Sequence, residues 1–267
     1  MEYKDNREEI RLERASDIQR LQIFTEIGRR AFEKTALLEN KDWDNTDETA
    51  VDSYLLQIAP FVHPKIEPSF WQHLIFTSVY AEMLAEKTGI MNPTEARIVA
   101  KLHDIGTAIN PTFLRKEYLG ASLLKVIGIK NEVIKSFPPV PRIYGVGGSI
   151  KSTEDMTPKQ NLVNVADNLG KMGPNGLFTK KAFIENAKGQ PSRYPPSIWP
   201  SSQVGYTRLT EKNKQDHAVQ LVLDEIQWLE EKYKINFDEL KNSVQAEFEN
   251  PERQKFLTSL INAQKTS

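Results

Sequence analysis

Apolar residues recur every three or four positions through most of this chain, which is the spacing of one face of an α-helix. The first such stripe lies within residues 6–38, and its members are Ile18, Leu21, Phe24, Ile27 and Ala31. No segment shows a convincing alternation of apolar and polar residues, the pattern of a half-buried strand. The pattern therefore predicts an all-α protein.

Capping signals divide the rest of the chain into helices. Four candidate starts are Ser69, Asn92-Pro93-Thr94-Glu95, Asn110-Pro111 and Thr157-Pro158-Lys159-Gln160. They predict helices over residues 69–89, 93–106, 110–128 and 157–171, and periodicity adds shorter ones over 47–59, 130–137 and 178–187. Two C-terminal helices are expected over residues 210–233 and 238–263, after an irregular connection at 189–207 that is rich in Pro, Ser and aromatic residues.

Composition narrows the classes of function. The 267 residues carry a net charge of −1, so nothing global favours extended nucleic-acid binding or a membrane surface. The chain has no cysteine, which excludes disulfides, thiolate zinc sites, iron–sulfur clusters and cysteine nucleophiles. Its N-terminus is charged, lacks the apolar segment of a signal peptide, and no stretch reaches the length of a membrane span, so we expect a cytoplasmic protein.

The dipeptide His103-Asp104 is the most informative candidate for chemistry, because it places a neutral nitrogen ligand beside an anionic oxygen ligand. His73 lies near the start of the preceding predicted helix, and the short turn between the two helices makes them antiparallel neighbours. His73 and His103 can therefore approach each other, and Asp167 would join them from a third helix. Two imidazoles and two carboxylates suit Mn, Fe, Co, Ni or Zn better than Ca or Mg.

These residues, in this order, resemble the His … His-Asp … Asp pattern of the HD-domain superfamily of metal-dependent phosphohydrolases. The matching segments are Trp71-Gln72-His73-Leu74, Lys101-Leu102-His103-Asp104-Ile105-Gly106 and Asn164-Val165-Ala166-Asp167-Asn168-Leu169-Gly170-Lys171. The resemblance implies a helical bundle, here with additional N- and C-terminal helices. We expect N-terminal helices over residues 1–60 packing on a core over 61–188, with residues 189–267 adding the connection and C-terminal helices within the same compact unit.

Two departures from the family pattern limit the number of metals. Thr107 stands where many members have a Lys after His-Asp-Ile-Gly. Bimetallic members carry a further His where this chain has Lys116, and residues 137–148 hold no His where a later one would fall. The resemblance therefore implies a single divalent metal ion bound by His73, His103, Asp104 and Asp167.

The resemblance implies hydrolysis of a small phosphorylated substrate, with nucleotides as the leading class. In that role Asp104 or Asp167 would orient the attacking water, Lys116 would place a positive charge near the phosphate, and Arg142 and Lys151 would add phosphate contacts. The alternative is a non-catalytic HD-like module that binds a nucleotide or a protein, which the departure at Thr107 favours. A single-strand nuclease is a third alternative that the near-neutral charge disfavours. The apolar stripe of residues 6–38 would pack on the core or on a second copy of the chain, so a homo-oligomer stays open.

Overall fold

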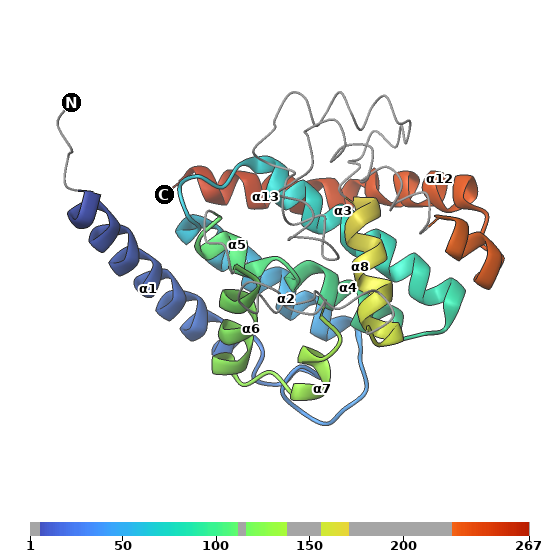
Figure 1. The fold of residues 1–267 in the computed structure, drawn as a ribbon, viewed down its shortest axis with the longest axis horizontal. Coiled ribbons are helices and arrows are strands. Elements are labelled where there is room, and N and C mark those ends of the chain that lie inside the picture. The colour runs from blue at the N-terminus through green and yellow to red at the C-terminus, as the bar shows by residue number, and fades with distance from the viewer. Residues whose placement is uncertain (1–5, 112–115, 138–155, 171–225, 267) are drawn as a thin grey trace, which may run out of the picture.

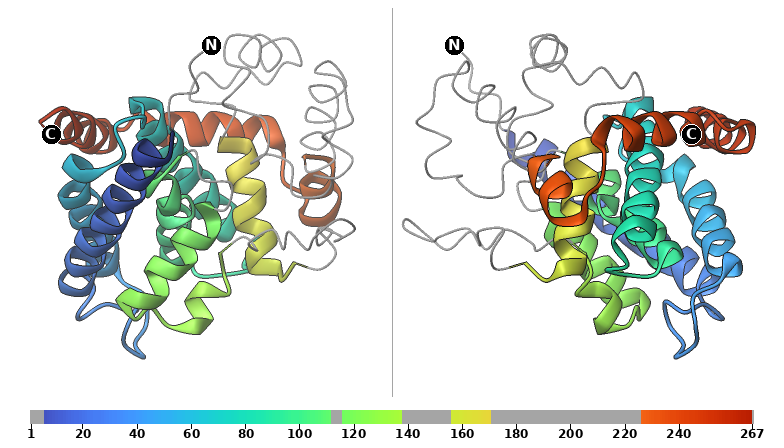
Figure 2. Two further views of the ribbon diagram at one scale, coloured as in Figure 1. Left: turned by 60° about the vertical axis from the view of Figure 1, so that its left-hand side comes forward. Right: turned by 90° about the vertical axis from the view of Figure 1, so that its right-hand side faces the viewer.

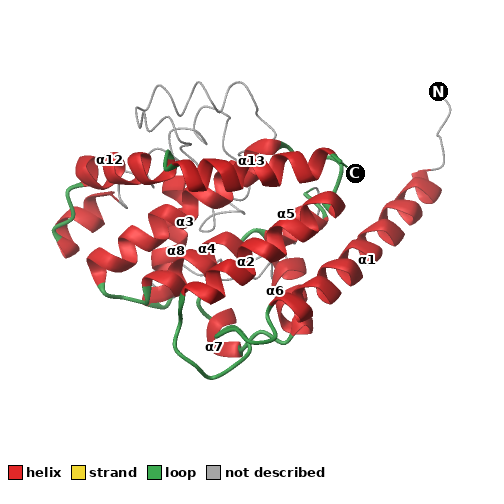
Figure 3. Ribbon diagram, turned by 180° about the vertical axis from the view of Figure 1, so that it is seen from behind, coloured by secondary structure: helices red, strands yellow, loops and turns green. Residues whose placement is uncertain are grey.

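A computed structural model describes residues 6–111, 116–137, 156–170 and 226–266, and the side chains of 6–15 and 116–118 are not described. Every regular element in these residues is a helix, which confirms the all-α prediction (Figures 1 and 3). The elements are α1 (Asn6–Ala31), α2 (Asn45–Ile58), the 3-10 helix η1 (Ala59–Phe61), α3 (Pro68–Thr88), α4 (Pro93–Leu102), α5 (Ile105–Ile109), α6 (Lys116–Ile127), α7 (Asn131–Ile134), α8 (Pro158–Gly170), α12 (Phe237–Phe248) and α13 (Pro251–Lys265). Residues 226–233 are also helical.

The helices α3 and α4 form an antiparallel pair at the centre of the molecule. Gly89 ends α3 in the left-handed conformation, at a φ of 65°, and its N–H bonds to the carbonyl of Ala85. Asn92 then starts α4, because its side chain accepts hydrogen bonds from the N–H groups of Thr94 and Glu95. The expected start at Asn92-Pro93 is confirmed, and the tight turn holds the two helices side by side.

The helix α8 packs across this pair, chiefly against α3 (Figure 2). Thr157 and Gln160 form the expected capping box: the Gln160 N–H donates to Thr157 Oγ1 at 3.2 Å, and the Thr157 N–H donates to Gln160 Oε1 at 3.0 Å. All residues of α8 from Leu162 to Gly170 are buried. The helix α8, which is distant in sequence, thereby lies against α3 and α4.

Terminal helices cover the central helices, as expected. The helix α1 packs on α2, α5 and α6, and α12 and α13 lie along the other side, against α3 and α2 (Figure 1). Gln264 joins α13 to α3 and to the segment before it. Its Oε1 accepts a 2.7 Å hydrogen bond from the buried Trp71 Nε1, and its Nε2 donates to the carbonyl of Ile66.

A cluster of paired charges joins α2, α3, α4, α12 and α13, and its members are Glu48, Asp52, Glu82, Arg97, Lys101, Glu247 and Arg253. Lys101 is only 2% exposed, and its ammonium bonds to Glu48 at 2.8 Å and to Asp52 at 2.6 Å. Buried charges of this kind are tolerated only when they are paired. Because Lys101 and His103 are two residues apart, they lie on nearly opposite sides of α4.

Several predicted helix boundaries were wrong, and proline or the backbone explains three of them. The helix α3 begins at Pro68 rather than after Ser69, because proline takes the first helical position and Glu67 precedes it. The single helix expected over residues 238–263 is two, since Asn250 caps a new helix that starts at Pro251. The helix expected to reach Gly106 ends at Leu102, and α5 starts after a break at His103-Asp104.

The N-terminal helix also differs from the prediction. It ends at Ala31 rather than near residue 38, and hydrogen-bonded turns follow it. Phe24 and Ile27 of its apolar stripe are buried, but Ile18 is 59% exposed. At this turn α1 contacts the rest of the molecule through the adjacent Asp17, which accepts a 2.7 Å hydrogen bond from Asn110 Nδ2, and Ile18 faces away.

Candidate metal centre

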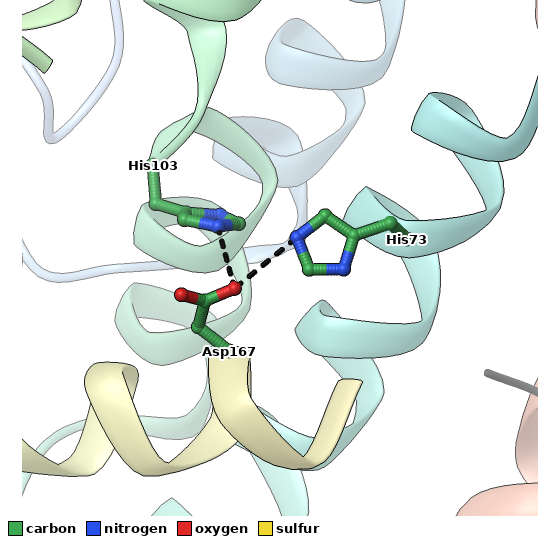
Figure 4. A group of neighbouring side chains, drawn as sticks. All are labelled: His73, His103 and Asp167. Carbon is green, nitrogen blue, oxygen red and sulfur yellow. Dashed lines mark hydrogen bonds and ion pairs between the residues drawn. The ribbon is translucent and has the colours of Figure 1, made fainter. Parts of the chain in front are cut away.

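His73 projects from the early part of α3 toward α4 and α8 (Figure 4). Its Nδ1 lies 3.3 Å from the hydroxyl of Thr77, one helical turn further on. Its Nε2 is buried and makes no hydrogen bond to any residue that the structure describes. A buried polar atom with no such partner is uncommon and calls for an explanation, which a bound ion would supply.

His103 occupies the C-cap of α4, and its side chain is only 4% exposed. Its Nδ1 lies 2.7 Å from the carbonyl oxygen of Ala100. A carbonyl only accepts hydrogen bonds, so Nδ1 carries the proton and Nε2 is left with its lone pair whenever the ring is neutral. This is the arrangement in which histidine binds a metal through Nε2.

Asp167 brings a carboxylate from α8 to both rings. Its Oδ1 lies 3.2 Å from Nε2 of His73 and 3.2 Å from Nε2 of His103 (Figure 4). The residue is 8% exposed, and the two rings meet edge to face with their centroids 5.3 Å apart. Three ligand atoms from three helices therefore converge.

Asp104 lies at the edge of this group. Its Oδ2 is 3.8 Å from Nε2 of His103 and 4.0 Å from Nε2 of His73, and its side chain is 20% exposed. Its φ of −105° and ψ of 16° interrupt the helix between α4 and α5. The break lets two consecutive residues face the same point, which a continuous helix would oppose because neighbouring side chains diverge by about 100°.

The spacing of these atoms fits a divalent metal ion. Ligand atoms at about 2.1 Å from a metal, and at right angles to each other, lie about 3.0 Å apart. The two nitrogen–oxygen distances of 3.2 Å are close to that value, and all three ligand atoms lie within 4.8 Å of one another. His73 Nε2 makes no hydrogen bond to the described part of the chain, which agrees with this fit.

Charge around His103 favours a cation at the same point. Burial alone would lower the pKa of His103, but the carboxylates of Asp104 and Asp167, the hydrogen bond with Asp167 and the carbonyl of Ala100 raise it above 6.5. The carboxylates therefore stabilise positive charge between the rings, whether a proton or a metal carries it.

Close packing between α3 and α8 holds Asp167 in reach of His73. Gly170 lies one turn after Asp167, and a Cβ at this position would stand 2.1 Å from Thr77 Oγ1 and 3.1 Å from Thr77 Cα. Only glycine permits this approach. Sequence reasoning missed both Thr77 and Gly170, although their spacings of four from His73 and three from Asp167 are visible in the sequence.

The structure brings His73, His103, Asp104 and Asp167 together. It does not describe the side chains of the three residues expected to bind phosphate. Arg142 and Lys151 lie outside the described residues, as does the side chain of Lys116, whose backbone begins the described part of α6. Thr107 is described, and its buried Oγ1 has no hydrogen-bond partner among the described residues.

Comparison with known proteins gives one match. Residues 70–172 match the family model of the HD domain, a range that contains the four candidate ligands. No curated protein and no solved structure matches the chain. Among the described residues, no helix has the length and apolar character that crossing a membrane requires.

Proposed function

From the match of residues 70–172 to the family model of the HD domain, we propose that the protein is a metal-dependent phosphohydrolase acting on a small phosphorylated substrate, with nucleotides as the leading class. HD domains are commonly metal-dependent hydrolases. The observation that carries the proposal is the convergence of His73 Nε2, His103 Nε2 and Asp167 Oδ1 at separations that suit one ion.

In this proposal His73, His103 and Asp167 bind one divalent metal ion, and Asp104 completes a set of four ligands. The mixed nitrogen and oxygen donors favour Mn, Fe, Co, Ni or Zn. Such an ion would supply positive charge for the phosphoryl transition state and would lower the pKa of a water molecule. The absence of cysteine from the chain agrees with a site built from His and Asp.

The residues of the chain would divide the remaining work. Asp104 is the most exposed of the four carboxylate and imidazole side chains, so it is best placed to orient the attacking water and to accept its proton. The carbonyl of Ala100 holds the proton of His103 on Nδ1, which directs Nε2 toward the metal. Lys116, Arg142 and Lys151 are proposed to bind the phosphate on the strength of the sequence alone.

Metal analysis and phosphate release test the proposal together. The purified protein is assayed for bound metal, and then for phosphate release from nucleoside mono-, di- and triphosphates and cyclic nucleotides with added Mn²⁺, Co²⁺ or Ni²⁺. We expect metal at up to one ion per chain and turnover of at least one substrate. His103→Asn and Asp167→Asn should lose metal and activity in parallel.

A surface variant controls for general damage. Asp238 in α12 has a side chain that is 82% exposed, so Asp238→Asn should retain metal, activity and thermal stability. Absence of bound metal, together with no turnover after any added ion, would refute the proposal. A nucleotide that raises thermal stability without being hydrolysed would instead support a non-catalytic binding module. The reason to consider this alternative is Thr107, which stands where many family members have a Lys.

A further inference from the structure

The two histidines of the candidate site differ in what fixes their protons. A neutral histidine binds a metal through Nε2 only when its proton is on Nδ1. The carbonyl of Ala100 enforces this form in His103, because it can only accept. In His73 the corresponding Nδ1 faces the hydroxyl of Thr77, which can either donate or accept.

The surroundings of Thr77 hold that hydroxyl in place. The side chain is fully buried, and its Oγ1 is confined between the His73 ring and Gly170, where a Cβ would stand 2.1 Å away. The hydroxyl therefore cannot swing away to solvent. The same helix that confines it also supplies Asp167.

The far side of the ring indicates which tautomer is present. His73 Nε2 is buried and makes no hydrogen bond among the described residues, even though Asp167 Oδ1 is 3.2 Å away. A proton on Nε2 would therefore face a carboxylate oxygen without the alignment that a good hydrogen bond needs. A proton on Nδ1 instead finds the Thr77 oxygen at 3.3 Å and leaves a lone pair at Nε2.

We propose that Thr77 is a positioning residue, whose hydroxyl accepts the Nδ1 proton of His73 and keeps the Nε2 lone pair turned toward His103 and Asp167. The purpose of this arrangement rests on the proposed metal function. The tautomer itself is a property of the metal-free protein and can be measured there.

Nitrogen-15 NMR of the histidine rings tests the tautomer directly. The chain has four histidines, so labelling with ¹⁵N-histidine gives a simple spectrum, and a His73→Asn sample assigns the His73 signals. The spectra are recorded without metal at about pH 8.5, where a neutral imidazole is expected to dominate. We expect His73 in the Nδ1–H form in the wild type and in Thr77→Ser, and a shift toward the Nε2–H form in Thr77→Val.

Affinity for Zn²⁺, measured by competition with a chelator, gives a second readout. Thr77→Val removes the hydroxyl with little change of shape, whereas Thr77→Ser keeps the hydroxyl and removes a methyl. Loss of a ligand's hydrogen-bond partner weakens metal binding by about 10- to 100-fold. Thr77→Val should therefore bind Zn²⁺ more weakly by this factor, and Thr77→Ser should keep the affinity of the wild type. If Thr77 acted only by packing, Thr77→Ser would bind Zn²⁺ more weakly than Thr77→Val. Thr77→Ala provides the same test if Val does not fold.

Two results would overturn the inference. One is an Nε2–H tautomer in the wild type. The other is a Thr77→Val or Thr77→Ala protein that keeps the Nδ1–H form and binds Zn²⁺ within about twofold of wild type, against the 10- to 100-fold loss expected. If the wild type binds no metal at all, the proposed function fails, and the NMR spectra still decide the role of Thr77.

Discussion

The contact between Gly170 and Thr77 gives the sharpest prediction about how the site is built. Gly170→Ala adds a Cβ at 2.1 Å from Thr77 Oγ1, 3.0 Å from its Cβ and 3.1 Å from its Cα. Two of these atoms belong to the backbone and the branching point of Thr77, so they cannot rotate away. The helices α3 and α8 must separate instead, and overpacking of this kind costs about 1–3 kcal/mol.

Gly28→Ala is a matched control. Both glycines lie near the C-terminal end of a helix, so the gain in helix propensity, at most about 1 kcal/mol, is shared. The new Cβ at residue 28 would stand 2.5 Å from Ile127 Cδ1, the end of a flexible side chain that can move. The difference between the two variants should therefore isolate the helix separation, with Gly170→Ala less stable by about 1–3 kcal/mol.

Urea unfolding and metal titration measure the two consequences. Unfolding curves for both variants, fitted to a common slope, give the difference in free energy of unfolding. Separation of α8 from α3 also moves Asp167 away from His73, so Gly170→Ala should bind Zn²⁺ at least about 10-fold more weakly, as in sites whose ligands lose their support. If Gly170→Ala matches Gly28→Ala in both stability and metal affinity, the close contact does not position the site.

The charge cluster on the other side of α4 supports two further predictions. Lys101→Met leaves the carboxylates of Glu48 and Asp52 without their buried partner and should cost about 3–5 kcal/mol in urea unfolding, as expected when one member of a buried pair is removed. Lys241→Met, which breaks an exposed pair, should cost less than about 1 kcal/mol, and equal losses would contradict the reasoning. Burial would raise the pKa of Glu48, but the neighbouring cations hold this pKa below its ordinary 4.5. The contribution of Glu48 to stability is therefore present above pH 4.5 and is lost as the pH falls through the lower pKa of the native state. Glu48→Gln should therefore flatten the loss of stability on acidification, measured by unfolding at a series of pH values, and an unchanged slope would refute this.

Local patterns predicted most of the fold because the relevant forces are local. The capping residues Asn92 and Thr157 and the glycine at the end of α3 act within a few residues, so their effects can be read from the chain. Ile18 shows the limit of this approach, since helical spacing defines an apolar face but does not say which part of it another element covers.

The candidate site could be predicted only as a set of residue types. His73, His103 and Asp167 follow from spacing and from the family resemblance, and the structure brings them together. Thr77 and Gly170 could not be assigned a role, because their contact arises only when α8 packs on α3. The break at Asp104 was also missed, since the apolar pattern continues through it into α5.

Asp167 is distant from the other proposed ligands along the chain and lies 64 positions after His103. An ion held by both would close a long loop, so the unfolded chain would have to lose considerable entropy before it could offer the same ligands. Binding would therefore follow folding rather than guide it, and the bound ion would act on the native state as a reversible cross-link. Its contribution to stability would then depend on the concentration of free metal, reaching about 2.7 kcal/mol at one hundred times the dissociation constant.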